Sequence, residues 1–334
     1  MKKLVSILCA AALALSLAGC GAQAADTNTN TNTTAPVVST VYSLEDATVF
    51  TFTDSGITAQ DGSDTGYEID GTALTIDSAG TYAVTGTCAD GSITVKKGTT
   101  GVTLVLNGLS LTSTGTAPIT CNKSTEVTII AAEGSVNSLK DSAGNNDDEY
   151  PNNEAAENAV IKCKDGSQVT LGGTGSLTIT ANGKNGIKSG ASTTEEGEAS
   201  LTIRELTLTI NAPVNDAVNA EQTLNVESGT LTISAADDAL HSDLVLNIGA
   251  EGAEGPAITI TECYEGIEGA ELNVYSGDIS ITSSDDCLNA ANSDLGDYDF
   301  TMSISGGTIV AYSSSGDGFD SNGDLTISGG SVTA

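Results

Sequence analysis

Five short phrases between residues 214 and 321 share one pattern: an acid, a tiny residue, a large apolar residue, a polar residue and a small residue. They read DAVNA, DALHS, EGIEG, DCLNA and DGFDS, and their acids are Asp216, Asp238, Glu265, Asp286 and Asp317. These acids recur 21 to 31 residues apart, and such a period is typical of solenoids, in which repeats stack on one another. If the phrases stack, their five carboxylates stack as well.

Stacked carboxylates favour a metal ion. Two unit charges about 5 Å apart repel by roughly 1 kcal/mol in water, and by more at a lower effective dielectric constant. Flexible, oxygen-rich turns suit Ca²⁺, which takes about 6–8 oxygen ligands. We therefore predict Ca²⁺ between adjacent coils, with turn carbonyls and Asn219 or Asn289 as additional ligands. The leading ligands are the phrase acids and the two acids directly before them: Asp216, Asp237, Asp238, Glu265, Asp285, Asp286 and Asp317. The alternative is a solvated acidic edge that discourages aggregation.

The charge of the chain is distributed unevenly. The formal net charge is −33, every Lys and Arg precedes residue 205, and the remainder holds 22 acids. A surface of this sign repels the phosphates of nucleic acid, so we expect no nucleic-acid partner. The acidic half requires cations to neutralise it, or else serves solubility.

Short runs that alternate aliphatic and polar residues lie between the acidic phrases. Examples are Leu224–Val226, Leu231–Ile233 and Ile279–Ile281, with Gly229 and Gly277 between such runs. These features are typical of short strands joined by turns. Three strands in roughly 21 residues predict an all-β chain, a right-handed parallel β-helix whose strands pair about 4.8 Å apart with their equivalents one coil on. A β-sandwich or barrel is the alternative, but it would call for hairpin turns.

The repeat also predicts which side chains face inward. The large residues form one column: Val218, Leu240, Ile267, Leu288 and Phe319. Small residues form a second column two positions on, because alternate residues of a strand point the same way: Ala220, Ser242, Gly269, Ala290 and Ser321. Weaker phrases that begin at Ala117, Ala159 and Asn185 extend the pattern toward the N-terminus. Residues 40–100 are expected to form the N-terminal cap and the first coils.

Insertions interrupt the repeat at 134–158, 191–199, 249–255 and 292–300, where a solenoid extrudes loops. The stretch 141–154 is acidic but lacks the Gly and Glu spacing of an EF-hand, so a flexible acidic loop is favoured there over a second metal site. Five cysteines remain beyond Cys9 and Cys20, and none forms a Cys-x-x-Cys motif. Because Cys121 and Cys163 occupy the small position of the repeat, we expect buried apolar residues and no metal–thiolate site.

The N-terminus has the features of an export signal. Lys2 and Lys3 precede an apolar stretch, and Leu17-Ala18-Gly19-Cys20 resembles the lipobox of bacterial lipoproteins. We expect a signal peptide over 1–20 with lipidation at Cys20, a low-complexity disordered tether over 21–40, and the β-helix domain over 41–334. The protein would then be exported and held at the bacterial cell surface, with a lipid anchor as its sole contact with the membrane. Because the chain stops inside a strand run, we also expect an incomplete C-terminus.

Four segments occur in a fixed order ahead of the acidic phrases: YAVTGT at 82–87, VTLVLNGL at 102–109, GSVNSLKD at 134–141 and LGGTGSLTI at 171–179. In this order, over roughly 42–334, the chain resembles a family of bacterial surface proteins with a carbohydrate-binding β-helix domain, akin in architecture to polysaccharide lyases. The resemblance implies a calcium-loaded right-handed β-helix that binds plant cell-wall polysaccharide, cellulose-like or pectin-like, without cleaving it. The chain departs from the family in having no Trp.

A polar row follows the large apolar residue of each phrase and should face outward. Lys188 belongs to it, and the candidate ligand-binding residues are Asn219, His241, Glu268, Asn289 and Asp320. The scattered tyrosines disfavour a flat aromatic platform, so polar or Ca²⁺-bridged capture is expected, suited to an acidic glycan such as polygalacturonate.

Three classes of function compete. The sequence favours a non-catalytic polysaccharide binder over a structural adhesin or stalk without glycan specificity. A pectate-type lyase needs a basic residue near the metal ion, and only Lys162, Lys184, Lys188 and Arg204 are near the acidic phrases. An inverting hydrolase needs two carboxylates about 6.5–9.5 Å apart, one with a raised pKa, and the lone His241 gives it no support. No catalytic residue is therefore assigned.

Overall fold

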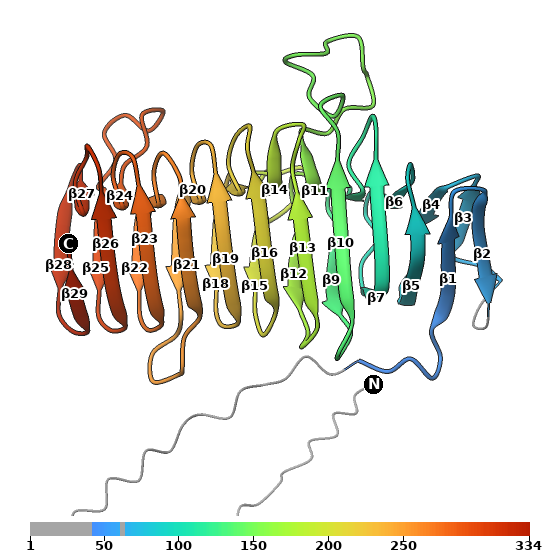
Figure 1. Ribbon diagram of the computed structural model, residues 1–334, viewed down its shortest axis with the longest axis horizontal. Helices are drawn as coiled ribbons and strands as arrows, with labels where there is room; N and C mark the ends of the chain where they lie inside the picture. Colours follow the sequence, from blue (N-terminus) through green and yellow to red (C-terminus); the bar gives the residue numbers. More distant parts are fainter. Residues whose placement is uncertain (1–41, 61–63) are drawn as a thin grey trace, which may run out of the picture. The chain divides into compact units, whose positions relative to one another are not determined.

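The computed structural model describes residues 42–60 and 64–334, which form strands and turns. Almost all strands pair in parallel with the equivalent strand one coil away, so the chain winds as a β-helix-like solenoid with three ladders of strands (Figure 1). Right-handed winding, usual for parallel crossovers, stays a prediction. Within the described ranges no helix is present that could cross a membrane. The predicted signal peptide over 1–20, the tether over 21–40 and Cys20 lie outside the described residues.

Each complete coil passes through the three ladders in order. The first ladder contains β4 (Ala73–Ile76), β6 (Ser92–Val95), β8 (Ile119–Cys121), β11 (Ala159–Cys163), β14 (Asn185–Ser189), β17 (Val218–Ala220), the starts of β20 (Leu240–Ile248) and β22 (Ile267–Val274), β24 (Leu288–Ala290) and β27 (Phe319–Ser321). The second contains β1 (Thr48–Thr53), the starts of β5 (Gly80–Cys88) and β7 (Val102–Ser113), β9 (Glu126–Ala131), β12 (Gln168–Gly172), β15 (Ser200–Ile203), β18 (Thr223–Val226), the ends of β20 and β22, β25 (Thr301–Ile304) and β28 (Asp324–Ile327).

The third ladder faces the reader in Figure 1. It contains the ends of β5 and β7, then β10 (Val136–Asp141), β13 (Ser176–Thr180), β16 (Thr207–Ala212), β19 (Thr230–Ala235), β21 (Ala257–Glu262), β23 (Asp278–Ser283), β26 (Thr308–Ser313) and β29 (Ser331–Thr333). At the N-terminal end, β2 (Gly56–Gln60) pairs antiparallel with β1, and β3 (Tyr67–Asp70) pairs antiparallel with β4. These two hairpins form the cap expected within 40–100.

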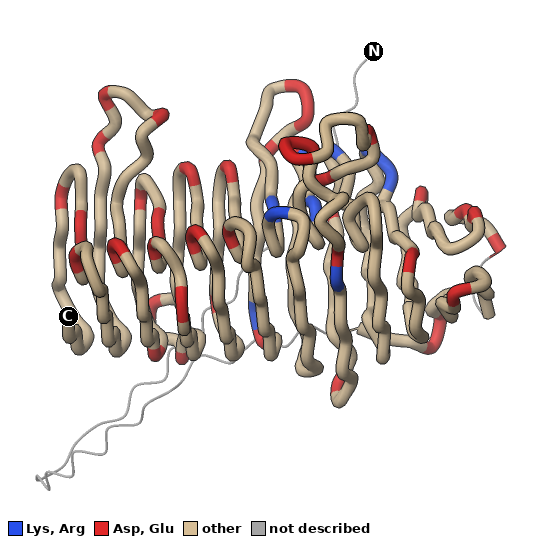
Figure 2. The backbone as a smooth tube through the Cα atoms, turned by 45° about the horizontal axis from the view of Figure 1, so that its top comes forward, with Lys and Arg blue, Asp and Glu red and all other residues tan. Residues whose placement is uncertain are grey.

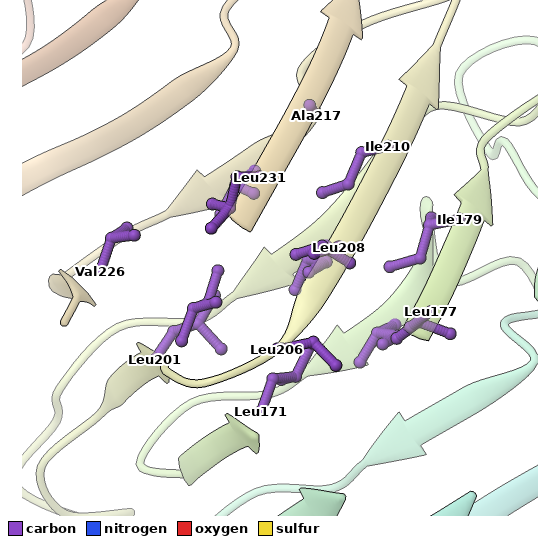
Figure 3. Packing of buried hydrophobic residues seen from close by; sticks show 14 of the residues in the cluster. Leu171, Leu177, Ile179, Leu201, Leu206, Leu208, Ile210, Ala217, Val226 and Leu231 are labelled. Carbon is purple, nitrogen blue, oxygen red and sulfur yellow. The ribbon is translucent and has the colours of Figure 1, made fainter. Parts of the chain in front are cut away.

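The predicted register of the phrases is confirmed. Val218 pairs with Leu240, Leu240 with Ile267, Ile267 with Leu288, and Leu288 with Phe319. The first four of these side chains are fully buried, while Phe319 in the last coil is half-buried. They belong to one hydrophobic core that extends from Phe50 to Ala311. Figure 3 shows part of this core, where aliphatic side chains from successive coils point into the interior.

The cysteines and the insertions also follow the predicted pattern. Cys121 and Cys163 pair in register inside the solenoid, and all five cysteines of the described chain are buried and free. The insertions lie between strands, but the first is shorter than predicted, because residues 136–141 of the expected loop form β10. The loop that follows begins at a buried Asp141. The carboxylate of Asp141 accepts hydrogen bonds from Asn145 Nδ2 (2.9 Å) and from the backbone N–H of Asn182 (2.6 Å), and these bonds fix the start of the loop.

Candidate functional site

The acidic phrases lie on top of one another at the turns between the third ladder and the first. Their backbones are joined directly, because each phrase's tiny residue donates its N–H to the carbonyl of the acid one coil on. Ala217 N lies 2.9 Å from Asp238 O, Ala239 N lies 3.0 Å from Glu265 O, and Cys287 N lies 3.0 Å from Asp317 O. These turn carbonyls already accept a hydrogen bond, which lowers their value as the extra metal ligands expected from the sequence. Figure 2 shows the acids along the C-terminal coils and the bases farther toward the N-terminus.

Three of the seven predicted metal ligands come together where the chain enters β17 and β20, in two adjacent coils. Carboxylate oxygens of Asp216, Asp237 and Asp238 all lie within 4.8 Å of one another. Asp216 is buried, and it accepts hydrogen bonds from Asn219 Nδ2 (2.6 Å) and from the backbone N–H of Asp238 (3.2 Å). Burial first, and then the charge of Asp238, raise the pKa of the Asp216 carboxyl. The raised pKa indicates that a charged Asp216 is unfavourable in this buried place beside Asp238.

His241 supplies a positive charge that the sequence analysis did not count. Its Nδ1 lies 3.1 Å from Asp238 Oδ2 and 2.7 Å from Glu268 Oε2, and its Nε2 lies 2.9 Å from Asp243 Oδ1. Burial alone would lower the pKa of His241, but hydrogen bonds to Asp238, Asp243 and Glu268 outweigh it and raise the pKa to about 12. His241 is therefore an imidazolium that neutralises part of the cluster. Asp243 was not predicted, although it lies two residues after His241 and hence on the same face of the strand.

Glu265 and Asn289 form a second polar group one to two coils farther on. Asn289 Nδ2 donates to Glu265 Oε2 at 2.9 Å. Burial raises the pKa of Glu265 to about 7, an increase that the hydrogen bond from Asn289 only partly opposes. Asn289 is 7% exposed, and its carbonyl Oδ1 is buried without a hydrogen-bond partner. In register, Asn289 is flanked by Glu268 and Asp320, so a buried acceptor lies between acidic side chains.

The last three predicted ligands lie nearer the C-terminal end. Asp286 Oδ1 accepts the backbone N–H of Asp317 at 2.7 Å, and burial raises the pKa of Asp286. A Cβ on Gly316 would lie 2.5 Å from Oδ1 of both Asp285 and Asp286, so two carboxylates converge beside this glycine. Asp317 is itself exposed. In the described chain none of these acids belongs to a group of three within 4.8 Å.

The geometry can be compared with the requirements of calcium. Two oxygens bound to one Ca²⁺ lie at most about 5 Å apart, because each Ca–O distance is roughly 2.3–2.6 Å. Asp216, Asp237 and Asp238 meet this limit, and these three residues fit calcium. The unpaired carbonyl of Asn289 is the type of oxygen that a hard cation takes, but it belongs to a phrase two coils farther on. Asp238, His241 and Glu268 also lie within 4.8 Å, but a metal ion would have to displace the proton of the imidazolium to bind its nitrogen.

The predicted outward row is in register, because its members pair successively: Lys188, Asn219, His241, Glu268, Asn289 and Asp320. Lys162, which was not predicted as a member, pairs with Lys188 and extends the row by one coil toward the N-terminus. Of its candidate glycan ligands, Asn219, His241 and Asn289 bond to neighbouring acids of the protein, and Glu268 bonds to His241. The row therefore runs from basic to acidic along the solenoid, and several of its members are engaged in holding the cluster together.

Comparisons with known proteins agree with this architecture. A family model described as carbohydrate-binding domain-containing protein matches residues 70–247, more than half of the chain. A carbohydrate-binding domain-containing protein of Acetivibrio thermocellus is 37% identical over 109 residues, which make up 32% of this chain and 37% of that relative. The matched stretch thus spans little more than a third of the relative's length.

A solved structure has the same fold. It is a gadolinium derivative of the polysaccharide lyase-like protein from C. thermocellum, which superposes with a TM-score of 0.60 at 24% sequence identity and covers 86% of this chain and 100% of that one. The family model matches more than half of the chain, and the ordered motifs and the register of the coils agree with it. The chain therefore belongs to the carbohydrate-binding domain-containing protein family.

Proposed function

We propose that this protein is a non-catalytic polysaccharide-binding lipoprotein of the bacterial cell surface whose solenoid is stabilised by calcium. Membership of a carbohydrate-binding family supports binding of a glycan. The observation that carries the calcium proposal is the convergence of Asp216, Asp237 and Asp238, two of which are buried, in a half of the chain that contains no Lys or Arg. Glu265, Asp285, Asp286 and Asp317 complete the proposed set of cation ligands along the same edge.

The ligand in this proposal is plant cell-wall polysaccharide, pectin-like or cellulose-like. A cation on the acidic edge would allow the carboxylates of a polyuronate to approach a surface that otherwise repels them. Asn219, His241, Glu268, Asn289 and Asp320 are the proposed contact row for the glycan. Export and lipidation at Cys20 would place the domain outside the cell, where such polymers occur.

Retention on insoluble polysaccharide tests the binding proposal. The full chain is incubated with cellulose and with polygalacturonate coupled covalently to beads, with ~1 mM Ca²⁺ or with excess chelator, and the bound fraction is measured. We expect retention on at least one polymer, and a lower bound fraction with chelator on pectate. If no polymer retains the protein under either condition, the chain is a structural adhesin or stalk.

Lipidation and export have a separate test. Metabolic labelling with a radioactive fatty acid should label the wild type in a bacterial host and leave Cys20→Ser unlabelled. The labelled protein should fractionate with the membrane and be degraded when intact cells are treated with protease. A wild type that takes up no label, or that resists the protease in intact cells, would contradict the proposed location.

A polysaccharide lyase is the second candidate, and one observation favours it. Lys162 lies on the outward row, in a pocket of about 280 Å³ that Lys123, Lys164 and Glu157 also line. Burial first, and then the charge of Lys188, lower the pKa of Lys162, as suits a residue that removes a proton. Product analysis distinguishes the two candidates: unsaturated uronates formed from polygalacturonate by the wild type and not by Lys162→Ala would establish a lyase.

A further inference from the structure

A pocket of about 380 Å³ opens on the outward face of the second ladder, away from the acidic turns. It lies where β18 and β20 end and where the inserted loop after β20 leaves the solenoid. Asn225, Asn247 and Tyr275 line it together with the loop residues Gly249 to Glu251. Its volume lies within the range of about 300–1,000 Å³ that is usual for small-molecule sites. The proposed calcium ligands and the outward row of the first ladder contribute nothing to its lining.

Two asparagines of the pocket wall, Asn225 and Asn247, belong to a row of amides in a fixed orientation. Asn225, Asn247 and Asn273 pair in register across three coils. Asn273 Nδ2 donates to Asn247 Oδ1 at 3.1 Å, and Asn247 Nδ2 donates to Asn225 Oδ1 at 2.9 Å. Each Nδ2 carries a second N–H, and each Oδ1 has a second lone pair. The row can therefore offer donors and acceptors at one-coil intervals, and its head-to-tail bonding fixes which atom of each amide faces which way.

The inserted loop forms the rim of the pocket and is tied to the next coil. The hydroxyl of Ser276 accepts the N–H of Ala250 and donates to its carbonyl, both at 3.2 Å. Ala253 N also bonds to Ala250 O at 3.2 Å, which closes a tight turn. In the next two coils the equivalent connections, 275–277 and 305–307, are short. This insertion thus makes a concavity on the outward face of the second ladder.

The chemistry of the lining favours an uncharged sugar. A tyrosine ring such as that of Tyr275 offers an apolar face to the C–H groups of a pyranose, together with a polar hydroxyl. Glu227 and Glu251 also line the pocket, and carboxylates accept strong hydrogen bonds from sugar hydroxyls. No basic residue lines the pocket itself. Arg204 Nη1 lies 3.9 Å from Glu227 Oε2 and partly compensates that carboxylate, so Glu251 is the main source of repulsion for the carboxylate of a uronate.

We propose that this pocket binds pyranose units of an uncharged glycan, and that it does so without a metal ion. The inference rests on the proposed polysaccharide-binding function. It assigns the uncharged, cellulose-like part of the proposed ligand range to a contact site separate from the calcium-dependent capture of acidic glycan at the turns. Tyr275 provides the stacking face, Asn225 and Asn247 the amide contacts, and Ser276 positions the loop.

Calorimetric titration of the full chain tests the proposal, with cellohexaose, xylohexaose and mannohexaose as probes and hexagalacturonate as the charged comparison. We expect at least one neutral hexasaccharide to bind with an affinity that chelator leaves unchanged. Tyr275→Ala should weaken this binding at least tenfold, and Tyr275→Phe much less. Tyr312→Ala is the matched control, because Tyr312 is an exposed tyrosine on the third ladder and its loss should have no effect.

Asn247→Asp provides an independent variant, since it keeps the side-chain shape but replaces an amide donor by a negative charge; it too should weaken binding at least tenfold. Melting temperatures within a few degrees of the wild type identify variants that fold. The inference fails if no neutral hexasaccharide binds, if chelator abolishes the binding, or if Tyr275→Ala and Asn247→Asp both bind like the wild type. Retention of the wild type on insoluble polymer would leave the proposed function standing in each of these cases.

Discussion

At the scale of single residues, the tiny position of the repeat follows from close contact between coils. Gly266 precedes the buried Ile267, and a Cβ on it would lie 2.3 Å from Cys287 O and 2.6 Å from Ile281 Cγ2. The first of these atoms is backbone and cannot move without disturbing the next coil. We expect Gly266→Ala to lower the free energy of unfolding by about 1–3 kcal/mol. Urea denaturation measures this loss.

Gly296→Ala is the control for that measurement, because a Cβ there would meet no atom within 4 Å. It should leave the free energy of unfolding within about 0.5 kcal/mol of the wild type. Equal midpoints for the two variants would show that the coils can separate enough to admit a methyl group, contrary to the packing argument.

The variant Asp216→Asn tests whether Asp216 is a metal ligand or a structural residue, because the two roles predict different changes in melting temperature and in calcium affinity. Without metal the substitution removes one of three crowded charges, while its amide oxygen can still accept the N–H of Asp238 and the Asn219 amide can turn to accept a bond. The melting temperature in chelator at pH 8 should therefore rise by a few degrees. Calcium affinity should fall at least tenfold, since a charged oxygen ligand is lost.

Both effects of Asp216→Asn are checked by thermal melts and calcium titration against Asp324→Asn. That control makes the same change of charge at an exposed acid on β28 and should alter neither quantity. A lower melting temperature in chelator together with unchanged calcium affinity would assign Asp216 a purely structural role.

At the scale of strands and coils, stability should depend on how deeply each side chain of the apolar column is buried. Leu288 is fully buried between Ile267 and Phe319, whereas Phe319 is half-buried. Leu288→Ala should cost about 2–5 kcal/mol of unfolding free energy. Phe319→Ala removes a larger side chain but should cost less, because less of its apolar surface is removed from water in the folded chain. Denaturant titration decides the order, and a larger loss at Phe319 would refute the burial argument.

The register of these coils could be predicted from the sequence because each strand position has its own requirement. Large apolar residues repeat at 218, 240, 267 and 288, and a slip of one residue would turn every one of them outward. The predicted extent of the first insertion was wrong. Apolar and polar residues alternate too weakly in Val136–Asp141 for the sequence pattern to reveal this strand. The repeating apolar pattern determines which strands pair, whereas the shape of a loop depends on individual hydrogen bonds such as those of Asp141.

The acidic site could be predicted only in outline. Sequence order gives the stacking of Asp216 on Asp238, but which side chains converge depends on turn shape and rotamers. Asp237 directly precedes Asp238 and joins a group of three acids. Asp285 directly precedes Asp286, two coils farther on, but belongs to no such group in the described chain. The role of His241 as a counter-charge was missed, because its partners Asp238 and Glu268 come from two different coils.

At the scale of the whole molecule, the clustered acids predict an unusual dependence of stability on pH. Burial raises the pKa of Glu265 from 4.5 to about 7, and burial likewise raises the pKa of Asp216, Asp238 and Asp286. Between the ordinary and the raised values the folded chain binds more protons than the unfolded chain. Stability must then fall as pH rises through this window, from about 4 to about 7.

His241 adds to the same trend at higher pH. Its pKa, raised from 6.5 to about 12 by its carboxylate partners, gives stabilisation that is complete below pH 6.5 and fades as pH rises toward 12. Acids whose pKa is lowered by lysine partners, such as Asp165 beside Lys123, act in the opposite sense, but only below about pH 4. Between pH 5 and pH 8 the buried carboxyl groups and His241, all with a raised pKa, therefore both make the fold less stable as pH rises.

The metal-free protein should accordingly melt at a higher temperature at pH 5 than at pH 8, and calcium should reduce or abolish that difference. A bound cation at the acidic turns replaces protons as the neutralising charge, so it stabilises most where the carboxylates are ionised, at pH 8, and least where protons already occupy them. Calorimetric melts at both pH values, in chelator and in ~1 mM Ca²⁺, give the four numbers required. If calcium raises the melting temperature equally at pH 5 and pH 8, protons and metal do not compete for the acidic edge, and the ions bind elsewhere on the chain.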